Sequence, residues 1–221
     1  MRFFGRKDEI AELHNIRNLS LHTARFTIVT GRRRSGKTSL LLKAYEDVED
    51  LLYFFVARKS EEELCKDFVN EIKEKLQIPI LGDVSRFADI FKYLLQLSKT
   101  RPLTIIIDEF QDFKRVNSSV FSDMQKIWDL NKQDAHVNLV VCGSIYSLMN
   151  IIFKNNKQPL YGRQTGEIKV TPFPPSVIKE ILCTYNPSYT NEDLLALYSY
   201  TGGMAEYVEM MLDAGANTKE L

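Results

Sequence analysis

Short runs of apolar residues alternate along the chain with longer segments in which apolar residues recur every three or four positions. Continuous apolar runs are typical of strands buried on both faces of a parallel sheet, and the wider spacing is typical of helices that cover it. Such runs predict strands near residues 26–30, 51–56, 103–107 and 137–142, and a fifth, shorter strand is expected near residues 167–171. Helical spacing fills most of the intervals, including a segment from about residue 84 to 98. The alternation predicts an α/β fold with a doubly wound, mainly parallel, five-stranded sheet.

The pattern changes after the fifth predicted strand. The segment Pro172-Phe173-Pro174-Pro175-Ser176 is typical of a rigid linker, and the spacing beyond it is helical. Thr190 to Asp193 has the composition of a capping box, and Gly202-Gly203 ends the helix that follows. We therefore expect two units, an α/β domain over residues 1–171 and a small helical lid over residues 172–221.

The segment between the first predicted strand and the next helix matches the phosphate-binding pattern G-x-x-x-x-G-K-T. Glycines let backbone N–H groups curl around a phosphate, and the helix N-terminus adds the positive end of its dipole. Lys37 is then able to reach the β- and γ-phosphate oxygens, and Thr38 offers its hydroxyl to Mg²⁺. The candidate nucleotide-binding residues of this segment are Gly31, Arg32, Arg33, Arg34, Ser35, Gly36, Lys37, Thr38 and Ser39. The alternative is an ordinary glycine-rich turn before a helix.

Two carboxylates, Asp108 and Glu109, follow the apolar run at residues 103–107. Ligands of open α/β sheets bind at the carboxyl ends of the strands, where these side chains are expected to lie. Asp108 would then hold hydrated Mg²⁺ near Thr38, and Glu109 would orient or deprotonate the attacking water. The alternative is a strand that ends in a charged turn. Together with the phosphate loop, the pair predicts a P-loop nucleotide hydrolase.

Two further residues are catalytic candidates beside Lys37 and Glu109. Ser144 follows the strand expected beside the phosphate-binding strand, where its hydroxyl would touch the γ-phosphate or the water, although a helix N-cap is an equal alternative. Arg163 is a candidate for stabilising charge across a subunit interface, and an exposed loop arginine is the alternative.

The tetrapeptide at residues 131–134 matches N-K-x-D, a guanine-reading signature. It closes a predicted helix and precedes a strand, whereas the signature belongs at the end of a strand. We therefore expect adenine rather than guanine specificity.

Charge is distributed unevenly along a chain whose formal net charge is zero. Residues 172–221 contain two lysines and seven acidic residues, a charge of −5, which leaves +5 for residues 1–171. No basic stripe with interleaved aromatics is present, so direct nucleic-acid binding by this chain is not supported.

No apolar run approaches membrane-spanning length and no secretory signal is visible, so a cytoplasmic protein is expected. The scattered residues Cys65, Cys142 and Cys183 are expected to be reduced, buried thiols.

These motifs, together with the opening Phe3-Phe4-Gly5-Arg6-Lys7-Asp8-Glu9, resemble the archaeal-type ATPase family of the AAA+/STAND branch. The similarity also covers residues 107–111, 143–144, 159–163 and 201–203. It implies a P-loop NTPase fold with strand order 5-1-4-3-2, and ATP and Mg²⁺ as cofactors. It also implies that Phe4, Gly5 and Arg6 lie in the base pocket.

The chain departs from this family in two places. Ala205 stands where many relatives have proline, and residues 172–221 contain no arginine. A lid arginine that contacts the γ-phosphate, used by many AAA+ proteins, therefore has no candidate. Family members often continue into winged-helix and nuclease-like domains, which these 221 residues do not include.

The leading hypothesis is hydrolysis of ATP to ADP and phosphate, with Mg²⁺, to drive conformational change. One alternative is a nucleotide-gated switch with negligible turnover, and another is a helical interaction scaffold with a vestigial loop. The expected ligands are ATP and ADP, while a homo-oligomer or a protein partner stays open.

Overall fold

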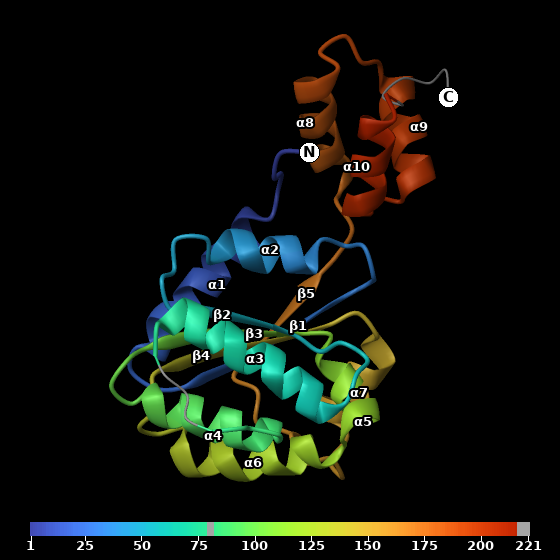
Figure 1. Ribbon diagram of the computed structural model, residues 1–221. Helices are drawn as coiled ribbons and strands as arrows, with labels where there is room; N and C mark the ends of the chain where they lie inside the picture. Colours follow the sequence, from blue (N-terminus) through green and yellow to red (C-terminus); the bar gives the residue numbers. More distant parts are fainter. Residues whose placement is uncertain (79–81, 216–221) are drawn as a thin grey trace.

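Five parallel strands form the centre of the computed structural model, which describes residues 1–78 and 82–215 (Figure 1). They are β1 (Arg25–Gly31), β2 (Leu51–Phe55), β3 (Leu103–Asp108), β4 (Val137–Gly143) and β5 (Gly166–Val170). The order is β2-β3-β4-β1-β5, which is 5-1-4-3-2 when read from the β5 edge. The predicted parallel α/β sheet is confirmed. Every residue of β3 and β4 is buried, as their continuous apolar sequences indicate.

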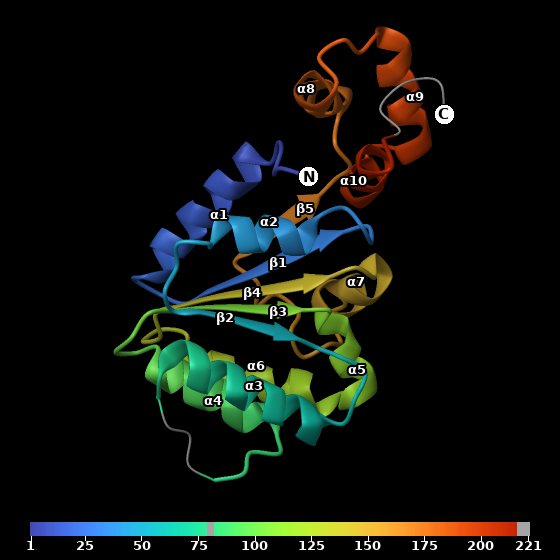
Figure 2. The ribbon, with the colours of Figure 1, turned by 45° about the horizontal axis from the view of Figure 1, so that its top comes forward.

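Helices cover both faces of the sheet (Figure 2). On one face lie α1 (Lys7–Ser20) and α2 (Lys37–Ala44), and on the other lie α3 (Glu61–Leu76), α4 (Phe87–Leu97) and α6 (Ser119–Asn131). A short 3₁₀ turn, η1 (Phe110–Asp112), leads from β3 into α5 (Phe113–Val116), and α7 (Tyr146–Lys154) follows β4. The two faces carry separate apolar clusters, and the buried apolar side chains of the strands pack into one or the other.

The helix predicted from about residue 84 begins three residues later, at Phe87. Arg86 has an extended backbone, and the Glu61 Oε1 atom accepts a hydrogen bond from the Phe87 backbone N at 2.8 Å. The α4 N-terminus is therefore satisfied by a side chain 26 residues away, which periodicity does not reveal. Pro79, whose missing backbone N–H predicts the end of the preceding helix, lies outside the described residues.

Three helices follow the sheet: α8 (Pro175–Tyr185), α9 (Asn191–Thr201) and α10 (Ala205–Asp213). They stand apart from the α/β layers beyond β5 (Figure 1). The predicted capping box is confirmed, because the Thr190 hydroxyl accepts from the Asp193 backbone and the Asp193 carboxylate accepts from Thr190. The helices share an apolar cluster with Phe4 and Phe173, so the N-terminal segment packs against them. Residues 216–221 of the expected helical unit lie outside the described part.

The linker is held to this helical unit at Gly203. The backbone N of Phe173 donates to the Gly203 carbonyl at 2.7 Å, and a Cβ added at Gly203 would lie 2.3 Å from the Phe173 carbonyl oxygen. Gly202 has a similar left-handed backbone, at φ +56° against +72° for Gly203, but a Cβ there would meet nothing within 4 Å.

This pair of glycines permits a matched stability test. We expect Gly202→Ala to lower the free energy of unfolding by about 1 kcal/mol, the cost of a left-handed alanine. Gly203→Ala adds the collision with Phe173, and we expect it to cost about 2 kcal/mol more. Urea unfolding of the two variants checks this difference. Equal losses would show that the linker moves aside without cost.

Candidate functional site

The loop between β1 and α2 carries a backbone conformation suited to an anion. Arg34 has φ +70° and Gly36 has φ +84°, so two residues of the loop are left-handed. A Cβ at Gly31 would lie 2.5 Å from the Val170 carbonyl oxygen, which explains glycine at that position. The first N–H groups of α2 have no partner within the helix and point toward the loop. The buried Ser35 hydroxyl is also without a hydrogen-bond partner among the described residues. Hydrogen-bond donors without protein partners, gathered at this loop, are suited to binding a phosphate group.

Lys37 is the first residue of α2 and is only 7% exposed. Its ammonium Nζ donates to the carbonyl oxygens of Gly31 at 3.2 Å and Arg32 at 3.0 Å. No carboxylate in residues 1–78 or 82–215 forms an ion pair with it. A nearly buried positive charge held only by carbonyl groups is well prepared to receive an anion.

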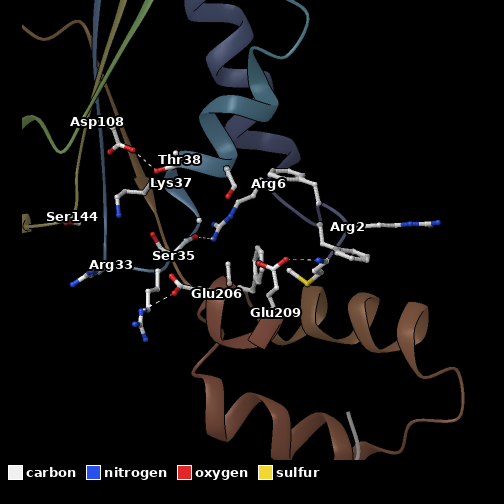
Figure 3. A pocket seen from close by; sticks show the side chains of 18 of the residues that line it. Arg2, Arg6, Arg33, Ser35, Lys37, Thr38, Asp108, Ser144, Glu206 and Glu209 are labelled. Carbon is white, nitrogen blue, oxygen red and sulfur yellow. Dashed lines mark hydrogen bonds and ion pairs between the residues drawn. The ribbon is translucent and has the colours of Figure 1, made fainter. Parts of the chain in front are cut away.

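Asp108 ends β3 directly opposite the start of α2 (Figure 3). Its Oδ2 atom accepts hydrogen bonds from Thr38 Oγ1 at 2.6 Å and from the Tyr53 hydroxyl at 2.9 Å, and its Oδ1 atom accepts from the Glu109 backbone N at 2.8 Å. Thr38 and Asp108 therefore supply neighbouring oxygen donors, the ligand type that Mg²⁺ prefers. Their predicted proximity is confirmed by the geometry.

Tyr53 is the residue of this cluster that sequence reasoning missed. It pairs in register with Ile106, two residues before Asp108, so the side chains of Tyr53 and Asp108 share one face of the sheet. The sheet order and this register together were the available signal. Burial, followed by the neighbouring Asp108 carboxylate, raises the pKa of Tyr53, so its phenol stays a hydrogen-bond donor.

We expect Tyr53→Phe to raise by about tenfold the Mg²⁺ concentration needed for half-maximal nucleotide binding. The Tyr53 hydrogen bond fixes the orientation of the Asp108 carboxylate, which would bind the metal. Titration of Mg²⁺ against a fluorescent ATP analogue measures the shift. Binding in the presence of EDTA is the control and should not change. An unaltered Mg²⁺ midpoint would make the hydrogen bond purely structural.

Glu109 leaves β3 with a left-handed backbone, φ +52°, which turns its side chain toward β4. Its Oε2 atom accepts from the Ser144 hydroxyl at 2.8 Å and from the Gln111 amide at 2.5 Å. Ser144 is not the N-cap of α7, since that position is Ile145. The alternative role of Ser144 as a cap is therefore wrong, and its hydroxyl faces Glu109 instead.

These groups open into a cleft of about 340 Å³ between the phosphate loop, the N-terminal segment and the helical unit (Figure 3). The predicted residues that line it are Phe4, Arg6, Arg33, Arg34, Ser35, Gly36, Lys37, Thr38, Ser39, Asp108, Glu109 and Ser144. Gly5, Gly31 and Arg32 do not line it. Gly5 is turned toward Val177, and Arg32 is exposed at the loop.

Arg6 lines the cleft, where its place in a base pocket stays a prediction, and it also holds neighbouring segments together. Its guanidinium donates to the carbonyl oxygens of Thr171 at 2.6 Å and Ser35 at 3.2 Å, and lies 4.7 Å from the centre of the Phe173 ring. It thus joins the N-terminal segment, the phosphate loop and the linker. The Phe4 and Phe173 side chains supply apolar surface at the same end of the cleft.

Arg163 is not brought to the cleft of its own chain. Its guanidinium donates to Asp129 Oδ2 at 2.9 and 3.1 Å. It lies just before β5, and the pairing of Gly166 with Thr27 places it near the amino ends of the strands, whereas the phosphate loop follows the carboxyl end of β1. This position keeps Arg163 out of the cleft of its own chain, and its predicted role across a subunit interface stays a prediction.

The tetrapeptide at residues 131–134 that matches the guanine-reading signature makes local contacts at the end of a helix. Asn131 donates to the Ile127 carbonyl, and Lys132 pairs with Asp129, at the end of α6 away from the cleft.

The prediction of buried thiols is confirmed for Cys65 and Cys142, and it is wrong for Cys183, which is exposed on α8. Burial, followed by the charge of Asp108, raises the pKa of Cys142 well above its ordinary value, so this thiol beside the site stays protonated.

A parallel sheet whose first strand leads through a G-x-x-x-x-G-K-T loop into a helix defines a P-loop protein. Residues 3–211 match the family described as the ATPase domain predominantly from Archaea, and the chain belongs to this family. The predicted resemblance is thereby confirmed. No helix in the described ranges is long and apolar enough to cross a membrane.

Similar proteins agree with this assignment. An uncharacterized protein of Methanocaldococcus jannaschii is 30% identical over 94% of this chain, which spans 43% of that protein. The Walker-type ATPase of Pyrococcus abyssi has a TM-score of 0.68 at 21% identity, over 96% of this chain and 72% of its own. The ORC2 protein of Aeropyrum pernix, solved as ADPNP-ADP complexes, has a TM-score of 0.67 at 15% identity, over 96% and 64%. The two structures share the fold.

Proposed function

We propose that this chain binds ATP with Mg²⁺ and hydrolyses it to ADP and phosphate. The observation that carries the proposal is the convergence of Lys37, Thr38, Asp108 and Glu109 on one cleft, from two segments distant in the sequence. The family assignment supports the same conclusion, since it describes an ATPase domain. Lys37 and the loop N–H groups would hold the phosphates, and Phe4 with Phe173 would contact the adenine.

The donor set fits Mg²⁺, which Thr38 and Asp108 would hold. When bound, Mg²⁺ supplies positive charge to the β- and γ-phosphate oxygens. Glu109 accepts a proton from the attacking water, whose oxygen forms the new bond to the γ-phosphorus as the bond to the ADP oxygen breaks. Ser144 and Gln111 orient the Glu109 carboxylate through their hydrogen bonds. Lys37 stabilises the charge that develops on the transferred group.

We also propose that residues 172–221 form a lid whose position responds to the nucleotide. A nucleotide-gated switch without turnover is the second candidate, favoured by the absence of arginine from this segment. The two candidates share the binding site and differ in whether Glu109 supports catalysis.

Competition experiments test the binding step that both candidates share. ATP is expected to displace a fluorescent nucleotide in the presence of Mg²⁺, with GTP much weaker. A clear preference for GTP would overturn the adenine assignment. Failure of every nucleotide to bind would overturn the proposed function.

A further inference from the structure

The tip of the phosphate loop contacts the first turn of α10. The Arg34 carbonyl oxygen accepts a hydrogen bond from the Glu206 backbone N at 3.2 Å, and Arg34 Nε lies 3.3 Å from Glu206 Oε1. The Arg34 guanidinium also lies 5.0 Å from the centre of the Tyr207 ring. A Cβ at Gly36 would come within 3.3 Å of the Ala205 Cβ atom. The helical unit therefore rests directly on the loop that is proposed to bind phosphate.

The helical side of this contact is acidic. Glu206 and Glu209 both line the cleft; Glu206 faces the phosphate loop and Glu209 faces the N-terminal segment (Figure 3). Glu209 is neutralised by the amino terminus of Met1, whose nitrogen lies 2.6 Å from its Oε1 atom. Among the described residues, Arg34 is the ion-pair partner of Glu206. Bound phosphates would thus approach a carboxylate whose counter-ion is an arginine of the phosphate loop itself.

The geometry leaves part of the guanidinium available. Nε faces Glu206, and a guanidinium has further donors on its two terminal nitrogens in a rigid fork. The Arg34 and Glu206 side chains are 39% and 50% exposed, so their ion pair alone is weak. A polyphosphate in the cleft is able to engage the terminal nitrogens while Nε stays with Glu206.

We propose that Arg34 bridges the terminal phosphate of bound ATP to Glu206, and so strengthens the contact between the helical unit and the loop when ATP is present. This inference rests on the proposed ATP binding. Because residues 172–221 lack arginine, the positive group that joins phosphate to the helices comes from the loop and not from the lid. ADP lacks the terminal phosphate, so the bridge is lost and the carboxylate is left facing a less charged ligand. The arrangement distinguishes ATP from ADP.

The chain supplies its own probes for the test. Trp128 is its single tryptophan and is buried in α6, while Cys183 is exposed on α8 and the other two cysteines are buried. Energy transfer from Trp128 to a dye on Cys183 therefore reports the position of the helical unit relative to the sheet. Calorimetry with Mg²⁺ and either ADP or a non-hydrolysable ATP analogue measures affinity.

The variants are Arg34→Gln, Arg34→Glu, and Arg34→Glu combined with Glu206→Arg. We expect Arg34→Gln to weaken binding of the ATP analogue by about tenfold, with ADP changed less than about twofold, and to abolish the ATP-dependent change in energy transfer. Arg34→Glu should lose that change and the charge-swapped double variant should recover it. Arg86→Gln is the matched control, because it makes the same chemical change at an exposed arginine that pairs with Asp123 outside the cleft, and it should retain the energy-transfer change.

The outcomes separate two failures. If wild type binds the ATP analogue but Arg34→Gln keeps the wild-type ratio of ATP to ADP affinity and the same energy-transfer change, the contact is packing and the inference is overturned. If wild type binds no nucleotide, the proposed function fails first. Thermal unfolding without nucleotide shows whether each variant is folded, and the charge-swapped variant keeps the test decisive if Arg34→Glu alone is destabilised.

Discussion

Replacing Glu109 with glutamine is expected to lower the steady-state rate of phosphate release from ATP by at least about a hundredfold, the usual contribution of a general base. The amide has the size of the carboxylate but cannot accept a proton from water. Its oxygen is still able to accept the Ser144 hydrogen bond seen at 2.8 Å for the carboxylate, so the local structure should persist. ATP affinity should be retained or slightly increased, because the variant also removes a negative charge near the phosphates.

Phosphate release and binding of a fluorescent ATP analogue, measured on the same preparations, check this expectation. Glu62→Gln provides a matched control, because it makes the same chemical change on the exposed face of α3, where Glu62 pairs with Lys66. Its rate should equal that of wild type. Equal, near-zero rates for wild type and Glu109→Gln, with tight ATP binding in both, would favour the nucleotide-gated switch.

The fold was predictable because its signals are local. Strands β1 to β4 are mainly apolar in sequence, β5 alternates buried and exposed residues, and the loop at Gly31–Thr38 carries its chemistry in consecutive residues. The proximity of Asp108 to Thr38 was also predictable, because the carboxyl ends of parallel strands lie at one edge of a sheet.

The remaining site residues depend on long-range packing. Tyr53 reaches Asp108 only through the register of β2 against β3, and an apolar run does not specify which residues pair across strands. Likewise, Glu206 meets Arg34 only because the helical unit packs beside the phosphate loop. Arg6 pairs with Glu9 of the same opening segment, but its contacts with the Ser35 and Thr171 carbonyls depend on how the loop and the linker pack.

Replacing Lys37 with methionine is expected to weaken nucleotide binding by about a hundredfold or more and to remove the thermal stabilisation that Mg²⁺ and ATP give. In the wild type, ligand at a hundred times its Kd stabilises the folded state by about 2.7 kcal/mol. The same ligand concentration would stabilise the folded variant only slightly. Methionine nearly matches the length of lysine, so the variant removes the charge with little change in volume. The ammonium contacts only the Gly31 and Arg32 carbonyls, and without ligand the variant should unfold near the wild-type temperature.

This contrast separates loss of the site from loss of the fold. A buried ammonium that no carboxylate of the described residues neutralises contributes little to stability, because its desolvation opposes its hydrogen bonds. The same isolation makes it effective once a phosphate arrives. Lys43→Met is the matched control, since Lys43 lies on the same helix, pairs with Glu46 and is absent from the cleft. Its nucleotide-induced shift in unfolding temperature should equal that of wild type. A Lys37→Met variant that kept this shift would place the phosphates somewhere other than the loop between β1 and α2.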